Sequence, residues 1–323
     1  MRIFRRAVLG GFAAAGFTEQ ANAADWPSRA LDWIVPFPPG GSNDTFARPI
    51  AAFVGQRLGE PVVVSNRGGA GGTMGAKTVA LAAANGYSML VGNTGLTYAS
   101  LVYPDTRFEL ERDLVPISGF ASVPVVLVVN PDKLDVTDFA AFLAAVRKSP
   151  GKYNIGSSGL GTIPHLAIEL LKARTGIDIA HVPYRGGGPA LQDMLNGQID
   201  STFQPLSTVV SYVQAGRLRA LAIAAARRET LMPDLPTFAE VGLPDFRVST
   251  WYGLFAPKAT PGPILDTLHD SIQTALADPN IRRIWAEQGA HAMIESRQAF
   301  TEFVARETKL WNEIARTTSI PME

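Results

Sequence analysis

The 323-residue sequence contains no cysteine, which excludes disulfides, thiol catalysis and cysteine-ligated metals. Histidine is scarce too, with 4 residues that stand apart from one another: His165, His181, His269 and His291. Neither charge sign is in excess, because 29 lysines and arginines balance 29 aspartates and glutamates. This balance gives no reason to expect nucleic acid or an acidic membrane as a partner.

The sequence also lacks the common catalytic and cofactor motifs. In GGAGGTMG, Met74 stands where the dinucleotide motif G-x-G-x-x-G requires glycine, and in GSSGLG, Leu160 stands where the nucleophile elbow G-x-S-x-G requires it. His165 and Glu169 share one face of a predicted helix, but the second histidine of a zinc motif is missing. We therefore expect no cofactor and no metal site, and a protein that binds without catalysis.

The first pattern that is present is an export signal. Residues MRIFRR are basic, AVLGGFAAAGF is a short apolar stretch, and ANA before Ala24 fits a small-x-small cleavage site. A membrane span needs about 20 apolar residues, so this stretch is too short to be one. We expect residues 1–23 to be a signal peptide, cleaved after Ala23, and the mature protein to be periplasmic. Arg5 and Arg6 leave twin-arginine export open beside the Sec route.

The rest of the chain has a globular composition, with 46% hydrophobic and 18% charged residues. Short apolar runs predict strands at residues 31–37, 61–65, 87–92, 115–129, 153–156, 179–183, 199–204, 218–224 and 248–256. Helical patterns between them lie at residues 43–58, 73–84, 137–148, 163–175, 188–196 and 207–215. This alternation favours an α/β fold with mostly parallel sheets flanked by helices. After Pro261 the spacing instead predicts two amphipathic helices, around residues 264–276 and 300–314.

The apolar run at residues 115–129 is about twice the usual length of a strand. A strand this long can serve two sheets in turn, and the run at residues 248–256 can return beside it. We therefore expect a middle domain, residues 124–247, inserted into a domain built from residues 24–123 and 248–323.

A glycine-rich loop follows the first predicted strand, in the stretch VPFPPGGSNDTFAR. Its prolines stiffen the turn, and Gly40 and Gly41 allow the backbone to approach a ligand closely. A helix then begins, with Asp44 in its first turn. Open α/β sheets bind ligands at loops of this kind, and free amides at a helix start attract anions. The alternative is a tight turn without a ligand.

Four more glycine-rich loops repeat this arrangement, at residues 66–76, 91–97, 155–165 and 182–195. They come from both predicted domains. Together they predict a cleft between the domains whose walls are backbone amides and hydroxyls. Such uncharged groups bind a carboxylate reversibly without the desolvation cost of a buried ion pair.

Taken in order, these loops resemble the substrate-binding proteins of tripartite tricarboxylate transporters, also called the Bug or TctC family. The matching stretches are PFPPGGSNDTFAR, VVVSNRGGAGGTMGAK, GYSMLVGNTG, YNIGSSGLGTIPHLAIELL, VPYRGGGPALQDMLNGQID, GRLRALAIAAARR and WYGLFAPKATP. The resemblance implies a two-domain periplasmic-binding-protein fold that closes like a Venus flytrap over a small organic acid. It implies delivery of that acid to a membrane permease and no enzyme activity, and we expect a monomer.

The resemblance also implies which residues bind the acid. The first domain would contribute Pro39, Gly40, Gly41, Asp44 and Thr94, and the second Ser157, Ser158, Gly159, Thr162, His165, Tyr184, Gly187 and Ala190. Gln204 departs from the family pattern, which often has aspartate there, and therefore bears on the choice of ligand. Further candidates are Arg67 and Arg185 as carboxylate partners, and Phe37, Trp251 and Tyr252 as the pocket floor.

Two other functions stay open. A sensor that feeds a two-component system would share the fold and the cleft. A secreted α/β hydrolase would use Ser157 or Ser158 together with His165. The acid itself is not identified by the sequence, because backbone contacts recognise a carboxylate and not the rest of the molecule.

Overall fold

The computed structural model of the chain describes residues 26–244 and 246–317. The expected signal peptide, residues 1–23, and its cleavage point after Ala23 lie outside these residues. No helix within the described part of the chain combines the length and the apolar character that a bilayer crossing requires.

Nine strands form within residues 26–244 and 246–317, and each lies within two residues of a run predicted from the sequence. They are β1 (Leu31–Val35), β2 (Val62–Asn66), β3 (Ser88–Asn93), β4 (Leu114–Val129), β5 (Asn154–Ser157), β6 (Ala180–Pro183), β7 (Ser201–Pro205), β8 (Arg219–Ile223) and β9 (Ser249–Pro257). The stretch VPVVLVV in β4 is apolar without interruption, which is typical of a strand covered on both faces, whereas β5, β6 and β7 also contain polar residues.

The strands pair in the order β2-β1-β3-β9-β4-β7-β5-β6, and β8 pairs with β4. β1 is parallel to β2 and β3, and β5 is parallel to β6 and β7. β9 is antiparallel to β3 and β4, and β4 is antiparallel to β7 and β8. The outer strands are therefore parallel, as expected, and the two long strands that return between the halves make each sheet mixed.

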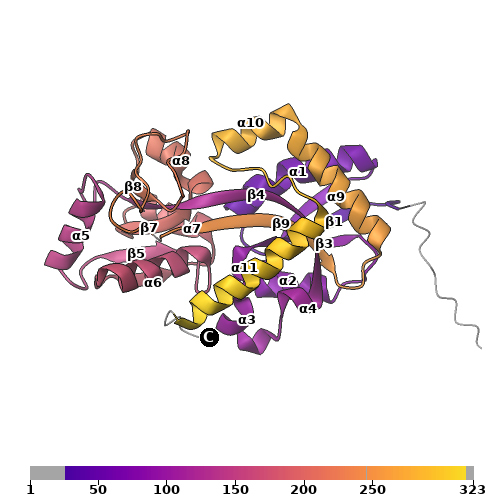
Figure 1. Cartoon of the computed structure of the whole chain (residues 1–323), viewed down its shortest axis with the longest axis horizontal. Helices are drawn as coiled ribbons and strands as arrows, with labels where there is room; N and C mark the ends of the chain where they lie inside the picture. The colour runs from indigo at the N-terminus through magenta and orange to yellow at the C-terminus, as the bar shows by residue number, and fades with distance from the viewer. Residues whose placement is uncertain (1–25, 245, 318–323) are drawn as a thin grey trace, which may run out of the picture.

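The long strand β4 serves two sheets in turn. Its residues from Leu114 to Pro124 pair with β9, and its residues from Val125 to Val129 pair with β7. Figure 1 shows β4 and β9 crossing the middle of the molecule, with β1 and β3 at one end and β5 and β7 at the other. The two halves of the protein are thus joined by continuous strands.

The helices predicted from the sequence are all present. Six of them alternate with strands: α1 (Ser42–Leu58), α2 (Thr73–Ala80), α5 (Phe139–Lys148), α6 (Ile163–Thr175), α7 (Gly187–Leu195) and α8 (Leu206–Gln214). Two belong to the C-terminal part, α9 (Gly262–Ala277) and α11 (Arg297–Thr317). Short segments that the sequence did not predict are η2 (Ala70–Gly72), η3 (Thr94–Thr97), α3 (Ala99–Val102), η4 (Pro104–Thr106) and α4 (Leu110–Asp113).

The sequence pattern also did not predict helix α10 (Pro279–Glu287), because DPN at residues 278–280 is typical of a break between two helices as well. In the structure Asp278 is the N-cap, and its Oδ1 accepts hydrogen bonds from the backbone N–H groups of Asn280 and Ile281. Pro279 takes the first helical position, where the missing N–H costs nothing. The same three residues therefore start a helix.

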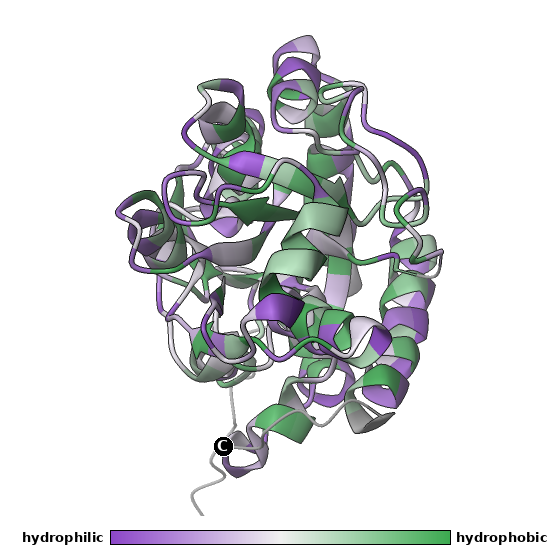
Figure 2. Cartoon of the chain, turned by 90° about the vertical axis from the view of Figure 1, so that its left-hand side faces the viewer, coloured by the Kyte–Doolittle hydropathy of each residue, from purple (hydrophilic) through white to green (hydrophobic). Residues whose placement is uncertain are grey.

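Helices cover both faces of the joined sheets. One hydrophobic cluster packs α1, α9 and α10 on the first half and continues through α7 and α8 on the second. On the opposite face, α2 and α11 pack on the first half, and α5 and α6 on the second. Figure 2 shows the hydrophobic colour along the central strands, with hydrophilic residues more frequent on outer helices and loops. The helices thus bury both faces of the joined sheets.

Candidate functional site

A small cavity of about 50 Å³ lies where the carboxyl ends of β1, β3, β5 and β7 meet. Both halves of the protein line it, through Phe37, Pro38, Gly41, Ser42, Asn43, Asn93, Gly95, Ser158, Thr162, Ile163, Pro164, Gly187, Gln204, Pro205, Thr208, Thr250 and Tyr252. A wider hollow of about 660 Å³ adjoins it, since Phe37, Pro38 and Ser158 line both. Strand ends from two sheets thus form one crevice, as ligand sites in open α/β sheets do.

Four helices begin at the wall of this cavity. Their N-cap residues are Gly41 for α1, Thr162 for α6, Gly186 for α7 and Pro205 for α8, and none of the four accepts a hydrogen bond through its side chain. Away from the cavity, α5 and α10 are capped by Asp138 and Asp278, whereas α2 and α9 also lack a side-chain cap. An uncapped helix start offers free N–H groups and a partial positive charge. Four such starts converge on the cavity.

None of the described residues that line this cavity carries a charged side chain. Arg185 is exposed and lines only the wider hollow, and Arg67 is exposed and lines neither. The positive character of the site therefore comes from the backbone. Helix N-termini of this kind bind anions without a formal counter-charge.

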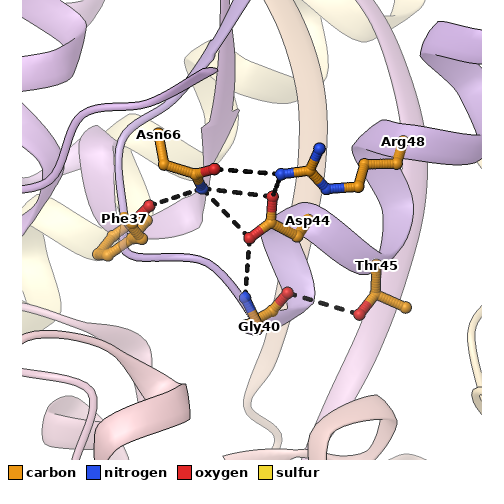
Figure 3. A network of polar contacts seen from close by, with 7 residues as sticks. Phe37, Gly40, Asp44, Thr45, Arg48 and Asn66 are labelled. Atoms are coloured by element: carbon orange, nitrogen blue, oxygen red, sulfur yellow. Dashed lines mark hydrogen bonds and ion pairs between the residues drawn. The ribbon is translucent and has the colours of Figure 1, made fainter. Parts of the chain in front are cut away.

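The carboxylate of Asp44 lies behind the first loop and does not line the cavity. Its Oδ2 accepts a hydrogen bond from the backbone N–H of Gly40 at 2.9 Å, and its Oδ1 pairs with Arg48 Nη2 at 2.7 Å. The Asn66 amide donates to both Asp44 oxygens and to the backbone oxygen of Phe37 (Figure 3). Asp44 thus holds the loop in shape, and the Gly40 N–H is already paired.

Two other residues expected at the first wall also lie away from the cavity. Pro39 is exposed and lines neither the small cavity nor the wider hollow. Thr94 is fully buried, and its Oγ1 accepts a hydrogen bond from the backbone N–H of Trp251 at 2.9 Å. Of the first-domain residues implied by the resemblance, only Gly41 lines the small cavity.

The loop after β5 contributes more of its expected residues. Ser158 and Thr162 line the small cavity, and Gly159 lines the wider hollow. Ser157 is buried instead, with its Oγ 2.7 Å from His181 Nε2 and 3.1 Å from the N–H of Gly159. The Ser157 hydroxyl therefore supports the loop from inside, and its histidine partner is His181 rather than His165.

His165 is buried below this loop and does not line the cavity. Its Nδ1 accepts a hydrogen bond from the Gly161 N–H at 3.1 Å, and its ring stacks on His181 with centroids 4.3 Å apart. Burial, then the nearby His181 and Lys172, lower the pKa of His165 to about 3. Burial and Lys172 lower the pKa of His181 to about 4. Both rings are therefore neutral at physiological pH.

His165, His181 and Glu169 lie close enough together to suggest a metal site, with ligand atoms within 4.8 Å of one another. The two rings are nearly parallel, at 10°, and face each other at 4.3 Å. A zinc ion must lie about 2.0–2.1 Å from each nitrogen, in the plane of its ring. Stacked rings cannot meet this condition together, and Glu169 is already paired with Lys172 Nζ at 3.1 Å. The arrangement does not suit a metal.

The residues expected from the third loop divide in the same way. Gly187 lines the small cavity, and Tyr184 lines the wider hollow while its hydroxyl donates to Asp193 Oδ2 at 2.8 Å. Ala190 is buried inside α7. Gln204, at the end of β7, is fully buried and lines the small cavity.

Several lining residues were not predicted as ligand contacts: Ser42, Asn43, Asn93, Thr208 and Thr250. Ser42 and Asn43 could have been found, because both stand at the helix start that the sequence indicated. Thr208 could not have been found from the sequence, because its 2.7 Å hydrogen bond to Ser42 joins residues far apart in the chain.

Two of the three aromatic candidates line the cavity, Phe37 and Tyr252. Burial raises the pKa of Tyr252 to about 12, so its hydroxyl stays protonated there. Trp251 points to the other side of β9, where its Nε1 donates to Glu307 Oε2 at 3.0 Å.

The two halves touch across the crevice. The Tyr103 hydroxyl, from the first half, donates a 3.0 Å hydrogen bond to the backbone oxygen of Leu160 in the second. A Cβ at Gly186 would lie 3.2 Å from Pro38 Cδ, so the third loop needs glycine to approach the first this closely. The structure therefore has its loops closed over the cavity.

Comparisons with known proteins agree with this geometry. The family described as "Tripartite tricarboxylate transporter family receptor" matches residues 46–320. Protein BugT of Bordetella pertussis is 38% identical over 320 residues, covering 98% of each chain. The solved structure of the periplasmic binding protein BugD has a TM-score of 0.88 and 31% identity, covering 92% of this chain and all of BugD.

A further solved structure, R. palustris Rpa4515 with adipate, has a TM-score of 0.89 and 33% identity, covering 93% of this chain and all of that one. These matches confirm the two-domain α/β fold and the resemblance seen in the loop sequences. The chain belongs to the tripartite tricarboxylate transporter receptor family, also known as the Bug or TctC family of periplasmic solute-binding proteins.

Proposed function

We propose that this protein captures a small organic acid in the cavity and delivers it to the membrane permease of a tripartite tricarboxylate transporter. The observation that carries the proposal is the convergence of four uncapped helix starts on a cavity without charged side chains. Free backbone N–H groups suit a carboxylate. Because no buried ion pair has to be broken, the acid can leave again when the protein meets its permease.

In this proposal the acid touches Gly41, Ser158, Thr162, Gly187 and Gln204, which already line the cavity. Gly159 and Tyr184 contact it from the wider hollow or guide its entry. Of the remaining expected residues, Asp44, Thr94, Ser157 and His165 support the loops from behind, Pro39 and Gly40 form the first loop itself, and Ala190 packs inside α7. The bound adipate of the similar Rpa4515 structure supports a carboxylate as the ligand.

The domain boundaries expected from the sequence support an opening motion. β4 changes partners between Pro124 and Val125, and β9 begins at Ser249. Residues 124–247 would therefore move as one domain against residues 24–123 and 248–323. Periplasmic binding proteins close over their ligands by this hinge mode. The signal peptide would direct the protein to the periplasm and be cleaved after Ala23.

A thermal-shift screen of the exported protein against small organic acids tests the proposal. An acid at 100 times its dissociation constant adds about 2.7 kcal/mol of stability, which is a clear rise in melting temperature. The methyl ester of each acid that binds is the control, since it lacks the anionic group. If no carboxylic acid raises the melting temperature, or if esters work equally well, capture of an acid is wrong.

Uptake of a labelled acid separates transport from the sensor function. Deleting the gene should abolish uptake if the protein serves a permease, and should leave uptake intact if it serves only a sensor kinase. Hydrolysis by Ser157 or Ser158 with His165 is not supported, because Ser158 lines the cavity while His165 is buried away from it, and Ser157, which pairs with His181, is buried too.

A further inference from the structure

We propose that Gln204 makes the site selective for acids that also carry a hydroxyl group. This inference rests on the proposed function, because it assumes that a carboxylate occupies the helix starts. To that function it adds a second recognised group, a hydroxyl that the ligand carries beside its carboxylate. The argument begins with an acceptor atom that is left without a partner.

Gln204 is fully buried at the cavity wall. Its Oε1 has no hydrogen-bond partner among the residues that the structure describes. A buried amide oxygen without a partner is costly, and most such groups in proteins are paired. A ligand in the adjoining cavity is well placed to supply the missing donor.

The orientation of the Gln204 amide is fixed by Thr202. The Thr202 hydroxyl has one hydrogen, which it donates to the backbone oxygen of Gly156 at 2.8 Å or of Phe203 at 3.2 Å. Thr202 Oγ1 can therefore only accept from Gln204, whose Nε2 lies 3.4 Å away. This contact keeps the NH₂ group on the Thr202 side and leaves Oε1 on the other.

Oε1 then lies against Gly187, which also lines the cavity. A Cβ at Gly187 would be 3.0 Å from Gln204 Oε1 and 3.4 Å from Ser158 Oγ. Glycine at this position leaves room for a ligand atom to reach both groups. The cavity wall therefore offers a buried acceptor beside a hydroxyl that can donate or accept.

A carboxylate cannot fill this role, because its oxygens only accept hydrogen bonds. A hydroxyl can donate to Gln204 Oε1 and still accept from Ser158. An acid with a hydroxyl near its carboxylate therefore satisfies both the helix starts and Gln204. The corresponding acid without the hydroxyl leaves Oε1 unpaired.

An ammonium group could also donate to Oε1, but its charge does not fit. The four helix starts present partial positive charge, which repels a cation. No described residue lining the cavity is acidic, and Asp44 is occupied by Gly40, Arg48 and Asn66. We therefore expect hydroxy acids to bind better than the matching amino acids.

Matched sets of three ligands test this inference on the unaltered protein. Lactate, propionate and alanine form one set; malate, succinate and aspartate a second; and 2-hydroxyglutarate, glutarate and glutamate a third. Isothermal titration calorimetry measures each dissociation constant. In the sets that bind, we expect the hydroxy acid to bind roughly tenfold or more tightly than the acid without the hydroxyl, and the amino acid to bind most weakly.

Variants then assign the preference to Gln204. Gln204→Met removes the acceptor at similar volume, and we expect the preference for the hydroxyl to fall to about twofold or less. Gln204→Glu adds a negative charge, which should reverse the order of hydroxy and amino acids. Thr202→Val frees the amide to rotate and should also shrink the preference. Gln192→Met, on the exposed side of α7, is the matched control and should leave it unchanged.

The outcomes separate this inference from the function on which it rests. If acids bind but the hydroxy acid is not preferred in any set, a water molecule satisfies Oε1, and the inference is wrong while acid capture stands. An unchanged preference in a folded Gln204→Met variant also overturns it. If no acid of any size binds, both the inference and the proposed function fail.

Discussion

At the scale of single residues, the neutral histidine pair under the second loop is the most unusual feature. His165 and His181 stack 4.3 Å apart, and His181 holds Ser157, whose neighbour Ser158 lines the cavity. Burial keeps the pKa of His165 at about 3 and that of His181 at about 4. Protonation of either ring would place a charge in a buried position beside the second ring. We therefore expect low pH to destabilise this loop before other parts of the protein.

We expect the protein to lose stability as the pH falls from about 6.5 towards 4. Unfolded histidine titrates near pH 6.5, so the unfolded chain binds protons in this window while the folded pair, with its lowered pKa values, does not. His165→Gln should flatten this dependence. Melting temperatures from pH 7 to pH 4 measure the effect, with the exposed His291→Gln as control. Parallel curves for wild type and His165→Gln would contradict the prediction.

At the scale of elements, four helices begin at the cavity without a side-chain hydrogen bond from their N-cap residues. Good caps contribute about 1 kcal/mol each, so the protein forgoes stability at these positions. Gly41 shows this clearly. Its φ of −93° is open to any residue, and a Cβ there would meet nothing within 4 Å. A side-chain cap would fit at Gly41, which suggests that the ligand takes its place.

Gly41→Asp should therefore stabilise the empty protein and weaken its binding of acids. The new carboxylate can cap α1, which gains a few tenths of a kcal/mol over glycine. It also places a negative charge where the acid binds, so we expect affinity to fall at least tenfold. Melting temperature and calorimetric titration measure the two effects. Gly41→Asn, a neutral cap of the same size, should retain more affinity; equal losses in both variants would show that charge is not the cause.

The elements themselves could be predicted from the sequence more fully than the site. All nine strands of the described residues lie at runs predicted from the sequence, and the glycine-rich loops indicated the strand ends at which the cavity lies. The sequence could not show that Asp44 turns back to pair with Gly40 and Arg48. Those two partners are local, but Asn66, which donates to both Asp44 oxygens, comes from a separate segment of the chain. The position of His165 below its loop likewise depends on its stacking against His181 of another strand. Local patterns identified the loops, and tertiary contacts decided which of their side chains face inward.

At the scale of the whole molecule, the two halves meet through contacts that opening would break. The Tyr103–Leu160 hydrogen bond spans the crevice. Ser42 joins α1 to α8 through Ser207 Oγ at 2.9 Å and Thr208 Oγ1 at 2.7 Å. These contacts favour the closed form together with the ligand, whereas β4 and β9 stay intact in either state.

Tyr103→Phe should speed release of the acid. It removes one hydrogen bond made only when the halves are closed, and such a bond contributes about 0.5–1.5 kcal/mol. We expect roughly a two- to tenfold increase in the dissociation rate with little change in the association rate. Stopped-flow fluorescence measures both rates. Tyr153→Phe, in the second half, is the control. A dissociation rate equal to that of the wild type would show that this contact does not hold the halves together.

The helix N-termini without side-chain caps also affect how a protein of this kind can evolve. Every residue except proline has a peptide N–H group, so most substitutions with neutral side chains would leave these donors in place for an acid. The uncharged side chains around these donors, such as Ser158, Gln204 and Thr250, would set which acid fits. If the proposed function holds, a duplicated copy would thus change its ligand through a few substitutions of these side chains and still bind a carboxylate.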